Sequence, residues 1–559
     1  MSTRTPGAPR REPDAPATDQ AQRETDTRAP DQAQRETDTR APDQAQRGTA
    51  PAPDQAQRDS DALTLDQASG SDPGRSRDPV RAPHPRRWLI LFVILAAECM
   101  DLLDGTVVNV AAPAIHRDLH TSATALQWIV GAYPMALAVG LLTGGRLGDL
   151  FGRRRLFLLG AAGFTLSSVL CGLAPSTGVL VGARIAQGLA GALMIPQGLG
   201  VLREVFPGEE FAKAFGLFGP VMGCAAMIGP ILGGAIVSLD VGHTQWRGVF
   251  LINLPLGLLA LAGAARLLPH STVRHARELD LSGVAIAGVA AMAIVYPLIQ
   301  GRVLGWPTWC YGSIAGGVAL LGVFGLHLRR RRAAGRDPLV QPAIFAHRGY
   351  SAGALVMMLY FGGMVGAMLA ITLFLQLGEG FSAIHAGLTL APFPLGTALT
   401  APLAGTVLAR YPGRALIQAG TVVSIAGYAG AAVLAANLSP LSTWALAGPL
   451  LIVGMGMGLF VVPAFGTIIG AVSDAEAGSA SGTLNALQQL GSGIGVAVLG
   501  TIFFSVLRHQ GFSEALRHAL WWQVAGLVAL LVLSPLLPAT TRAGAPGDPQ
   551  PDQGQPRSR

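Results

Sequence analysis

Long apolar segments separated by short polar ones run along the chain from about residue 88 to residue 538. A helix needs about 20 apolar residues to cross the hydrocarbon core of a bilayer, so the pattern predicts about fourteen membrane-spanning helices. The apolar runs are continuous and do not alternate with polar residues, which excludes a β-barrel. The expected segments are 88–110, 125–144, 156–174, 178–202, 214–238, 249–269, 282–300, 310–328, 350–376, 384–408, 415–436, 443–470, 484–507 and 519–538.

Basic residues test this interpretation, because cytoplasmic loops carry an excess of Lys and Arg. With the N-terminus in the cytoplasm and fourteen alternating spans, the C-terminus is cytoplasmic as well. The outside loops then receive Arg117, Arg247, Arg302, Arg508 and Arg517. The inside loops receive Arg146, Arg153 to Arg155, Arg203, Lys213, Arg266, Arg274, Arg277, Arg329 to Arg332, Arg336, Arg348, Arg410 and Arg414. The bias supports this orientation, although twelve spans would place both termini in the same way.

Charge is unevenly distributed over the 559 residues, of which 50% are hydrophobic and 13% charged. Soluble domains carry about 25% charged residues, and residues 1–87 alone hold 14 Arg and 15 Asp or Glu. The rest of the chain lacks the charges of a water-facing surface, which excludes a soluble multidomain enzyme. The net charge of +7 does not indicate nucleic-acid binding, and we expect the lipid bilayer as the surrounding partner.

Two polar tails flank the apolar body. Residues 1–87 repeat the unit DQAQRETDTRAP from Asp19 and from Asp31, and DQAQR returns at Asp43 and Asp54. A segment with so few large apolar residues does not offset its ordering entropy, so we expect a disordered cytoplasmic tail. A tether or docking arm and an extension without a specific role both remain open. Residues 539–559 are interpreted in the same way.

No catalytic or metal-binding motif stands out in the body. The four cysteines, Cys99, Cys171, Cys224 and Cys310, form no C-x-x-C pair and lie in or beside apolar stretches, so we expect ordinary buried residues and no metal site. The body lacks a phosphate-binding P-loop, an H-E-x-x-H helix and a G-x-S-x-G elbow. We therefore expect neither an enzyme nor a transporter driven by ATP.

Three acidic residues, Glu98, Asp101 and Asp104, lie inside the first expected span. Their spacing covers an arc of about 120° on a helix, and Asn109 is expected on the same face. An acid within the membrane costs at least about 2.5–3.5 kcal/mol on insertion scales, which makes these residues candidates for binding protons or a cationic substrate. A structural hydrogen bond to a neighbouring helix is the alternative for each.

Arg184 is the basic counterpart within the fourth expected span, in the stretch from Leu180 to Gly188. A buried Arg stays charged and binds a carboxylate or backbone carbonyls. When the guanidinium lies close to a carboxyl group, it favours the ionised carboxylate. When it moves away, the carboxyl group takes up a proton more readily, so an acid and Arg184 together are a candidate proton switch. An Arg bonded to carbonyls, or extended to the membrane surface, is the alternative.

Two glycine-bearing segments follow. The loop after the second span contains Gly145, Asp149, Gly152, Arg153 and Arg154, a combination that allows a tight turn, a helix cap and breakable ion pairs at the cytoplasmic end. The fifth span contains Gly229, Pro230, Gly233 and Gly234. Glycine permits close helix contact and proline bends a helix, so this span is expected to bend against a neighbour. Generic packing of small residues is the alternative.

Together these motifs resemble the major facilitator superfamily, in particular its fourteen-span drug:proton antiporter group. Gly145 to Arg155 resembles the loop signature, Leu103 to Pro113 the first-span signature, Arg184 to Gly188 the fourth-span motif and Gly229 to Gly234 the exporter motif. The resemblance extends through Trp246 to Gly257 and through Gly478 to Gly495. Leu150 replaces a basic residue of the loop signature, Ala225 a glycine, Gly248 an aromatic residue and Ala112 a leucine. Glu98 and Asp101 are not part of any signature.

The resemblance implies an all-α polytopic membrane protein in which two six-helix bundles surround a central cavity and alternate their access. We expect an N-terminal bundle in residues 88–269, a linker with two extra transmembrane helices in 270–349, and a C-terminal bundle in 350–538. It also implies proton-driven export of drug-like or antibiotic compounds across the cytoplasmic membrane, with no bound cofactor.

Roles follow for the candidate residues. Asp104 is the first candidate for proton coupling, and Arg184 is expected to modulate it. Asp101, Glu98 and Asn109 are expected to contact protons or a substrate, for which a cationic or amphipathic small molecule is the expectation. The loop residues form a cytoplasmic gate. The alternatives are an importer, an exporter of a specific metabolite or siderophore, and a membrane sensor that transports nothing. A monomer is the expected assembly.

Overall fold

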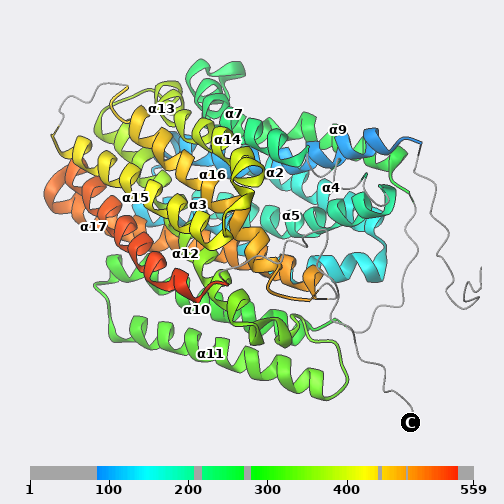
Figure 1. The fold of residues 1–559 in the computed structure, drawn as a ribbon. Coiled ribbons are helices and arrows are strands. Elements are labelled where there is room, and N and C mark those ends of the chain that lie inside the picture. The colour runs from blue at the N-terminus through cyan, green and yellow to red at the C-terminus, as the bar shows by residue number, and fades with distance from the viewer. Residues whose placement is uncertain are drawn as a thin grey trace, which may run out of the picture. The chain divides into compact units, whose positions relative to one another are not determined.

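The computed structural model describes residues 85–206, 210, 214, 217–269, 279–437, 444–473 and 476–538. Every regular element in these residues is a helix, as the apolar pattern predicts (Figure 1). The expected disordered tails lie outside the described residues except for residues 85–87. The main helices are α2 (Arg87–Leu119), α3 (Ala123–Phe151), α4 (Arg153–Gly172), α5 (Thr177–Val205), α7 (Phe218–Leu239), α8 (Gly248–Leu251), α9 (Asn253–Leu267), α10 (Leu281–Leu304), α11 (Thr308–Ala333), α12 (Arg348–Leu373), α13 (Ala383–Leu390), α14 (Pro392–Gly405), α15 (Gly413–Asn437), α16 (Ala447–Ile469) and α17 (Ala477–Leu533).

The expected segments fall mainly on helical structure, but some of them are divided differently. Segment 384–408 is broken into α13 and α14, and Pro392 begins α14 because proline fits the first turn of a helix. Segments 484–507 and 519–538 lie on α17, whose backbone leaves the helical conformation at Gly511, with φ 83° and ψ 178°. Glycine adopts this conformation without the steric cost of a side chain, so α17 contains two helical stretches.

Ten helices among the described residues are long and apolar enough to span a membrane. α2 is not one of them, and its acidic residues at positions 98, 101 and 104 lower its apolar character. α7 contributes a shorter apolar stretch, Ile228–Leu239, and α17 is a single candidate that carries two expected spans. A multi-pass membrane protein is therefore confirmed, whereas the count of fourteen and the cytoplasmic termini stay predictions.

Local sequence explains where several helices begin. Ser122, Ser176 and Ser382 precede α3, α5 and α13, and each hydroxyl accepts a hydrogen bond from the backbone N–H three residues further on. The carboxylate of Asp280 does the same for α10. Such caps satisfy an N–H that the first helical turn leaves without a partner.

The helices pack mainly within two sets. α2, α3, α4, α5, α7 and α9 contact one another and form the first helix group, and α12 to α17 form the second, from which α13 also contacts α7. α10 and α11 pack against each other at one edge of the molecule, where α10 also contacts α3 and α17 (Figure 1). The extra helix pair therefore lies beside the helices through which the two groups meet.

The two groups make direct contact toward the Leu119 end of α2. Gln127, near the start of α3, donates to the carbonyl oxygen of Ala497 on α17 at 3.1 Å. Gln376, after α12, donates to the carbonyl oxygen of Val110 on α2 at 2.8 Å. Because both amides are buried, these bonds form in a medium that strengthens them.

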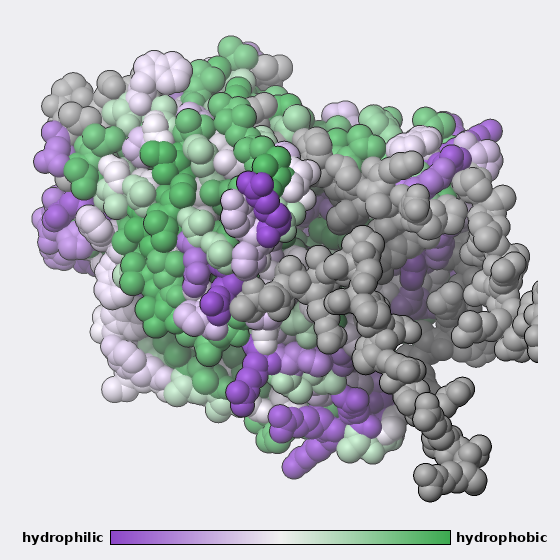
Figure 2. Space-filling view, viewed as in Figure 1, coloured by the Kyte–Doolittle hydropathy of each residue, from purple (hydrophilic) through white to green (hydrophobic). Residues whose placement is uncertain are grey.

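Large apolar side chains cover much of the outward surface (Figure 2). Leu399 on α14, Val422 on α15 and Val323 on α11 are each about half exposed. A water-facing surface rarely carries continuous apolar area of this kind. The outward faces thus match the hydrocarbon surroundings that the sequence predicts.

Candidate functional site

A buried polar cluster lies inside the first helix group, around Asp104 of α2. The Asp104 carboxylate is 1% exposed and accepts hydrogen bonds from Arg184 and Gln187 of α5 and from Asn253 of α9. The Gln187 and Asn253 bonds measure 2.8 and 3.0 Å. Gln187 and Asn253 both also donate to Ser168 Oγ on α4. The carboxylate thus joins α2 to α5 and α9, and Gln187 and Asn253 extend the cluster to α4.

Arg184 has several partners besides Asp104. Its Nε donates to the carbonyl oxygen of Ile129 at 3.3 Å, and one Nη donates to Gln187 Oε1 at 2.9 Å. The guanidinium carbon lies 4.3 Å from the centre of the Tyr133 ring on α3, a cation–π contact. The cation is therefore held by neutral groups as well as by the carboxylate.

The other two acids of α2 lie outside this cluster. Asp101 is half-buried and accepts a hydrogen bond from the hydroxyl of Tyr133, whose ring contacts Arg184. Glu98 is also half-buried, beside Gly198 of α5, where an added Cβ would lie 3.6 Å from Glu98 Oε1. The structure therefore connects Asp101 to Asp104 through Tyr133 and Arg184, and leaves Glu98 one turn away.

Asn109 forms its side-chain hydrogen bond within α2. Its amide nitrogen donates to the backbone carbonyl oxygen of Gly105 at 3.2 Å within the same helix. Its side-chain oxygen is buried, and in the described part of the chain it accepts no hydrogen bond. Asn109 is therefore not joined to Asp104, but it offers an unsatisfied acceptor on α2.

The predicted gate segment forms the tight connection between α3 and α4. Gly152 separates the two helices with φ 91° and ψ 128°, a conformation that side chains rarely adopt. Arg153 binds Asp149 at 3.2 Å and Glu204 of α5 at 3.5 Å. Arg154 donates to the carbonyl oxygen of Ala265 at the end of α9, at 2.6 Å. All of these bonds lie within the first helix group, so in the described part of the chain the ion pair of Asp149 does not reach the second group.

The end of α3 lies against α5 at small residues. A Cβ added to Gly144 would overlap the carbonyl oxygen of Ala192, and one added to Gly148 would overlap the side chain of Gln197. Gln197 in turn donates to the carbonyl oxygen of Gly144 at 2.7 Å. Gly145 is less crowded, with Pro196 Cβ at 3.9 Å from its added Cβ. The gate segment is thereby fixed to α5.

A cavity of about 450 Å³, which we call the gate cavity, lies between this end of α3 and the start of α17. Arg146, Asp149 and Arg153 line it on one side, and the stretch from Gly478 to Asn485 contributes to the other. Leu339 and Gln341, in the segment before α12, complete its wall. The two helix groups are therefore in contact toward the Leu119 end of α2 and separated by a polar cavity at the opposite end.

The glycines of α7 meet helices of both groups. A Cβ added to Gly229 would overlap Thr106 of α2, and one added to Gly233 would lie 2.7 Å from Val107. A Cβ added to Gly234 would lie 2.5 Å from the carbonyl oxygen of Ala383, on α13 of the second group. The backbone of Pro230 also contacts α13, because a Cβ added to Gly387 would overlap the Pro230 carbonyl oxygen. The run thus permits backbone contact between the two groups.

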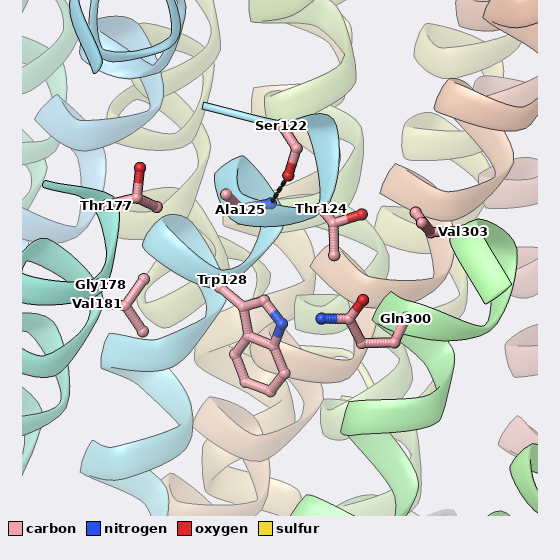
Figure 3. Close-up of a pocket in the computed structure, with 9 residues that line it drawn as sticks. All are labelled: Ser122, Thr124, Ala125, Trp128, Thr177, Gly178, Val181, Gln300 and Val303. Carbon is pink, nitrogen blue, oxygen red and sulfur yellow. Dashed lines mark hydrogen bonds between the residues drawn. The ribbon is translucent and has the colours of Figure 1, made fainter. Parts of the chain in front are cut away.

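A second cavity, of about 410 Å³, opens at the other ends of α3 and α5, beside α10. Figure 3 shows the indole of Trp128 and the amide of Gln300 turned toward each other across it. The Thr124 hydroxyl also lines it. The described lining carries no charged side chain, so this cavity differs in chemical character from the acidic face of α2.

Sequence reasoning overlooked four members of the buried cluster as site residues. Gln187 and Asn253 stand within the stretches that carry the family resemblance, and their amides inside apolar runs were the available signal. Tyr133 and Ser168 gave no such signal, because tyrosine and serine are common in membrane helices. In the described residues, no group of three His, Cys, Asp or Glu side chains is placed to hold a metal ion.

Comparison with known proteins places the chain among transporters. The family profile described as Major Facilitator Superfamily matches residues 94–496. The probable actinorhodin transporter of Streptomyces coelicolor is 43% identical over 433 residues, which cover 77% of this chain and 75% of that protein. The puromycin resistance protein of Streptomyces alboniger is 38% identical over 471 residues, with 82% and 92% covered. The crystal structure of a POT family transporter in complex with 5-aminolevulinic acid matches with a TM-score of 0.59 at 14% identity, over 81% of this chain and 96% of that one.

Proposed function

We propose that this chain, which belongs to the Major Facilitator Superfamily, exports antibiotic-like small molecules across the cell membrane in exchange for protons. The family and the relatives are transport proteins, so the chain is a multi-pass transporter and not an enzyme. The names of the relatives refer to actinorhodin and puromycin. Compounds of this kind are therefore the first substrates to test, and the proton gradient is the proposed driving force in place of a cofactor.

The buried pair of Asp104 and Arg184 carries the proton-coupling part of the proposal. An unpaired charge is unstable in a low-dielectric interior, so protonation of Asp104 and movement of Arg184 are energetically linked. Arg184 already contacts the Ile129 carbonyl and the Tyr133 ring, which hold the cation when the carboxylate is neutral. The geometry therefore suits a carboxyl group that exchanges a proton while the arginine stays charged.

Asp101 and Glu98 are the proposed contacts for an incoming proton or a cationic group. Both are half-buried, whereas Asp104 is enclosed. Asp101 reaches Arg184 through Tyr133. A cation that binds near Asp101 would thus influence the pair at Asp104 without contacting it, which is the coupling an antiporter requires.

Alternating access is the proposed motion. The gate cavity separates the two helix groups at the gate segment, while the groups meet at the opposite end. With a cytoplasmic N-terminus, this arrangement is open toward the cytoplasm. Closure would bring the start of α17 toward Arg146 and Asp149, and the small residues Gly478 and Gly482 leave room for that approach.

The test uses energised inverted vesicles that contain the full chain and a pH-quenched dye. Addition of puromycin to wild-type vesicles should release protons and raise the dye signal. Asp104→Asn keeps the shape of the side chain but binds no exchangeable proton, so substrate-triggered proton release should disappear.

Asp118→Asn is the matched control, because Asp118 lies at the far end of the same helix and bonds Trp246 and Arg247 instead. It should retain proton release. Unchanged proton coupling in Asp104→Asn would refute the role of Asp104. Net movement of puromycin out of the inverted vesicles, rather than into them, would refute export.

A further inference from the structure

Asp280 is a buried acid far from Asp104, at the start of the extra helix pair. Its side chain is fully buried. Oδ1 accepts hydrogen bonds from the Gly283 N–H, the Ser282 hydroxyl and His327 Nε2 of α11, at 2.9, 3.0 and 2.9 Å. Arg331 of α11 lies 3.6 Å from the same oxygen. This carboxylate therefore fastens α10 to α11.

The second oxygen of Asp280 serves a different element. Oδ2 accepts a hydrogen bond from the backbone N–H of Leu339 at 3.2 Å, in the segment that precedes α12. Burial by itself would raise the pKa of Asp280, but the hydrogen bonds from His327, Gly283, Ser282 and Leu339 outweigh it and hold this pKa below its ordinary value. The carboxylate is thus ionised, and each oxygen has its own donors.

The same segment is also held by α3. Arg146 of α3 donates to the carbonyl oxygens of Asp337 and Pro338, the first at 3.3 Å. Arg331 donates to the carbonyl oxygen of Asp337 at 3.0 Å and to that of Leu279 at 3.3 Å. Arg146 and Leu339 both line the gate cavity. A continuous set of bonds therefore runs from the extra helices to a wall of that cavity.

We infer that Asp280 is a positioning residue for the gate: it holds the segment 337–341 in place as a wall of the gate cavity and, through Arg146, couples the α10–α11 pair to the moving end of α3. The inference rests on the proposed transport function for its consequence, but the contacts themselves do not depend on it. The extra helices then act as a support for the gate, in addition to any role in crossing the membrane.

Two substitutions separate this role from helix capping. Asp280→Asn keeps the Oδ1 acceptor for Gly283, but its amide nitrogen cannot accept from the Leu339 N–H. Asp280→Ser is a good N-cap for α10 and is too short to reach Leu339. Both substitutions therefore break the bond to Leu339 in the cavity wall while the start of α10 remains capped. If one variant does not fold, the other still provides the test.

Hydrogen exchange of the full chain in lipid nanodiscs, read by mass spectrometry, tests the contact without any substrate. In Asp280→Asn and Asp280→Ser, the Leu339 amide should exchange roughly tenfold faster than in wild type, because its buried acceptor is gone. Ser282→Ala is the matched control: it removes one bond to Asp280 and leaves the Leu339 bond, so exchange at Leu339 should not change. Unchanged exchange at Leu339 in both Asp280 variants would overturn the inference.

Transport of puromycin into inverted vesicles tests the consequence. Asp280→Asn and Arg146→Lys should each lower the maximal rate roughly two- to tenfold with little change in KM, because they alter a conformational step and not substrate contact. The double variant should be no slower than the slower single one, since both changes interrupt the same connection. A double variant whose rate is lowered by the product of the two single reductions would contradict the coupling between Asp280 and Arg146. Absence of wild-type transport would count against the proposed function, while the exchange measurement would still decide the role of Asp280.

Discussion

Arg184 reaches from α5 to the carboxylate of Asp104 on α2, and the two side chains are 1% and 0% exposed. Removal of one partner from such a pair leaves an uncompensated charge in the interior, which typically costs about 3–5 kcal/mol. Removal of both leaves none. The pair should therefore show strong coupling in a double-mutant cycle.

We expect Arg184→Gln to lower the free energy of unfolding by about 3–5 kcal/mol. Asp104→Asn together with Arg184→Gln should cost less than the sum of the two single substitutions. Chemical unfolding of the detergent-solubilised protein measures all four members of the cycle. Strict additivity would mean that the two charges do not stabilise each other.

Gly234 should tolerate no side chain, because a Cβ there would lie 2.5 Å from the Ala383 carbonyl oxygen and 2.7 Å from Ile384 Cα. We expect Gly234→Ala to push α7 away from α13, at a cost of about 1–3 kcal/mol, and to reduce transport. Gly182→Ala is the control, since a Cβ on Gly182 meets no heavy atom within 4 Å. Thermal unfolding and transport of the two variants should differ clearly, and equal behaviour would show that this contact has no influence.

Gly152 is constrained by its backbone conformation. Its φ of 91° is unfavourable for any residue with a side chain, and forcing alanine into such a conformation costs about 1–3 kcal/mol. Gly152→Ala should therefore lower the melting temperature and loosen the connection between α3 and α4. Gly312→Ala on α11, which has open space and no positive φ, should have little effect. A Gly152→Ala variant as stable as wild type would argue against this constraint.

Stability should depend on pH through Asp280. Because its folded-state pKa lies below the ordinary value, its contribution is fully present above the unfolded-state pKa of about 3.9 and is lost as the pH falls through the lower folded-state value. Wild type should thus be more stable than Asp280→Asn at pH 7, and the difference should shrink below about pH 4. Melting curves of both proteins between pH 7 and pH 3 provide the measurement. A difference that grows on acidification would reverse the expected sign.

Asp104 and Arg184 could be predicted from the sequence, because a charged residue inside an apolar segment is recognised without knowledge of the fold. Sequence reasoning did not identify Tyr133 or Ser168, whose importance depends on which helices are neighbours, and helical periodicity does not determine this. It expected Asn109 on the face of the acids, and the bond of its amide to the Gly105 carbonyl is a detail that only the structure gives. Asp280 could not be predicted as a site residue, because it lies in a polar connecting segment where acidic residues are common. Only the structure shows that its side chain is buried.

The contact between α7 and α13 has a mechanical consequence. Gly234 faces the Ala383 carbonyl and Gly387 faces that of Pro230, so two backbones touch with no side chain between them. Close-packed interiors have low compressibility and transmit strain, so a contact of this kind passes a displacement on instead of absorbing it. If the two helix groups move, this point serves as a fulcrum, and a small displacement beside it becomes a larger one at the distant gate cavity. Gly234 and Gly387 would thereby determine how far the gate cavity opens for a given movement at this contact.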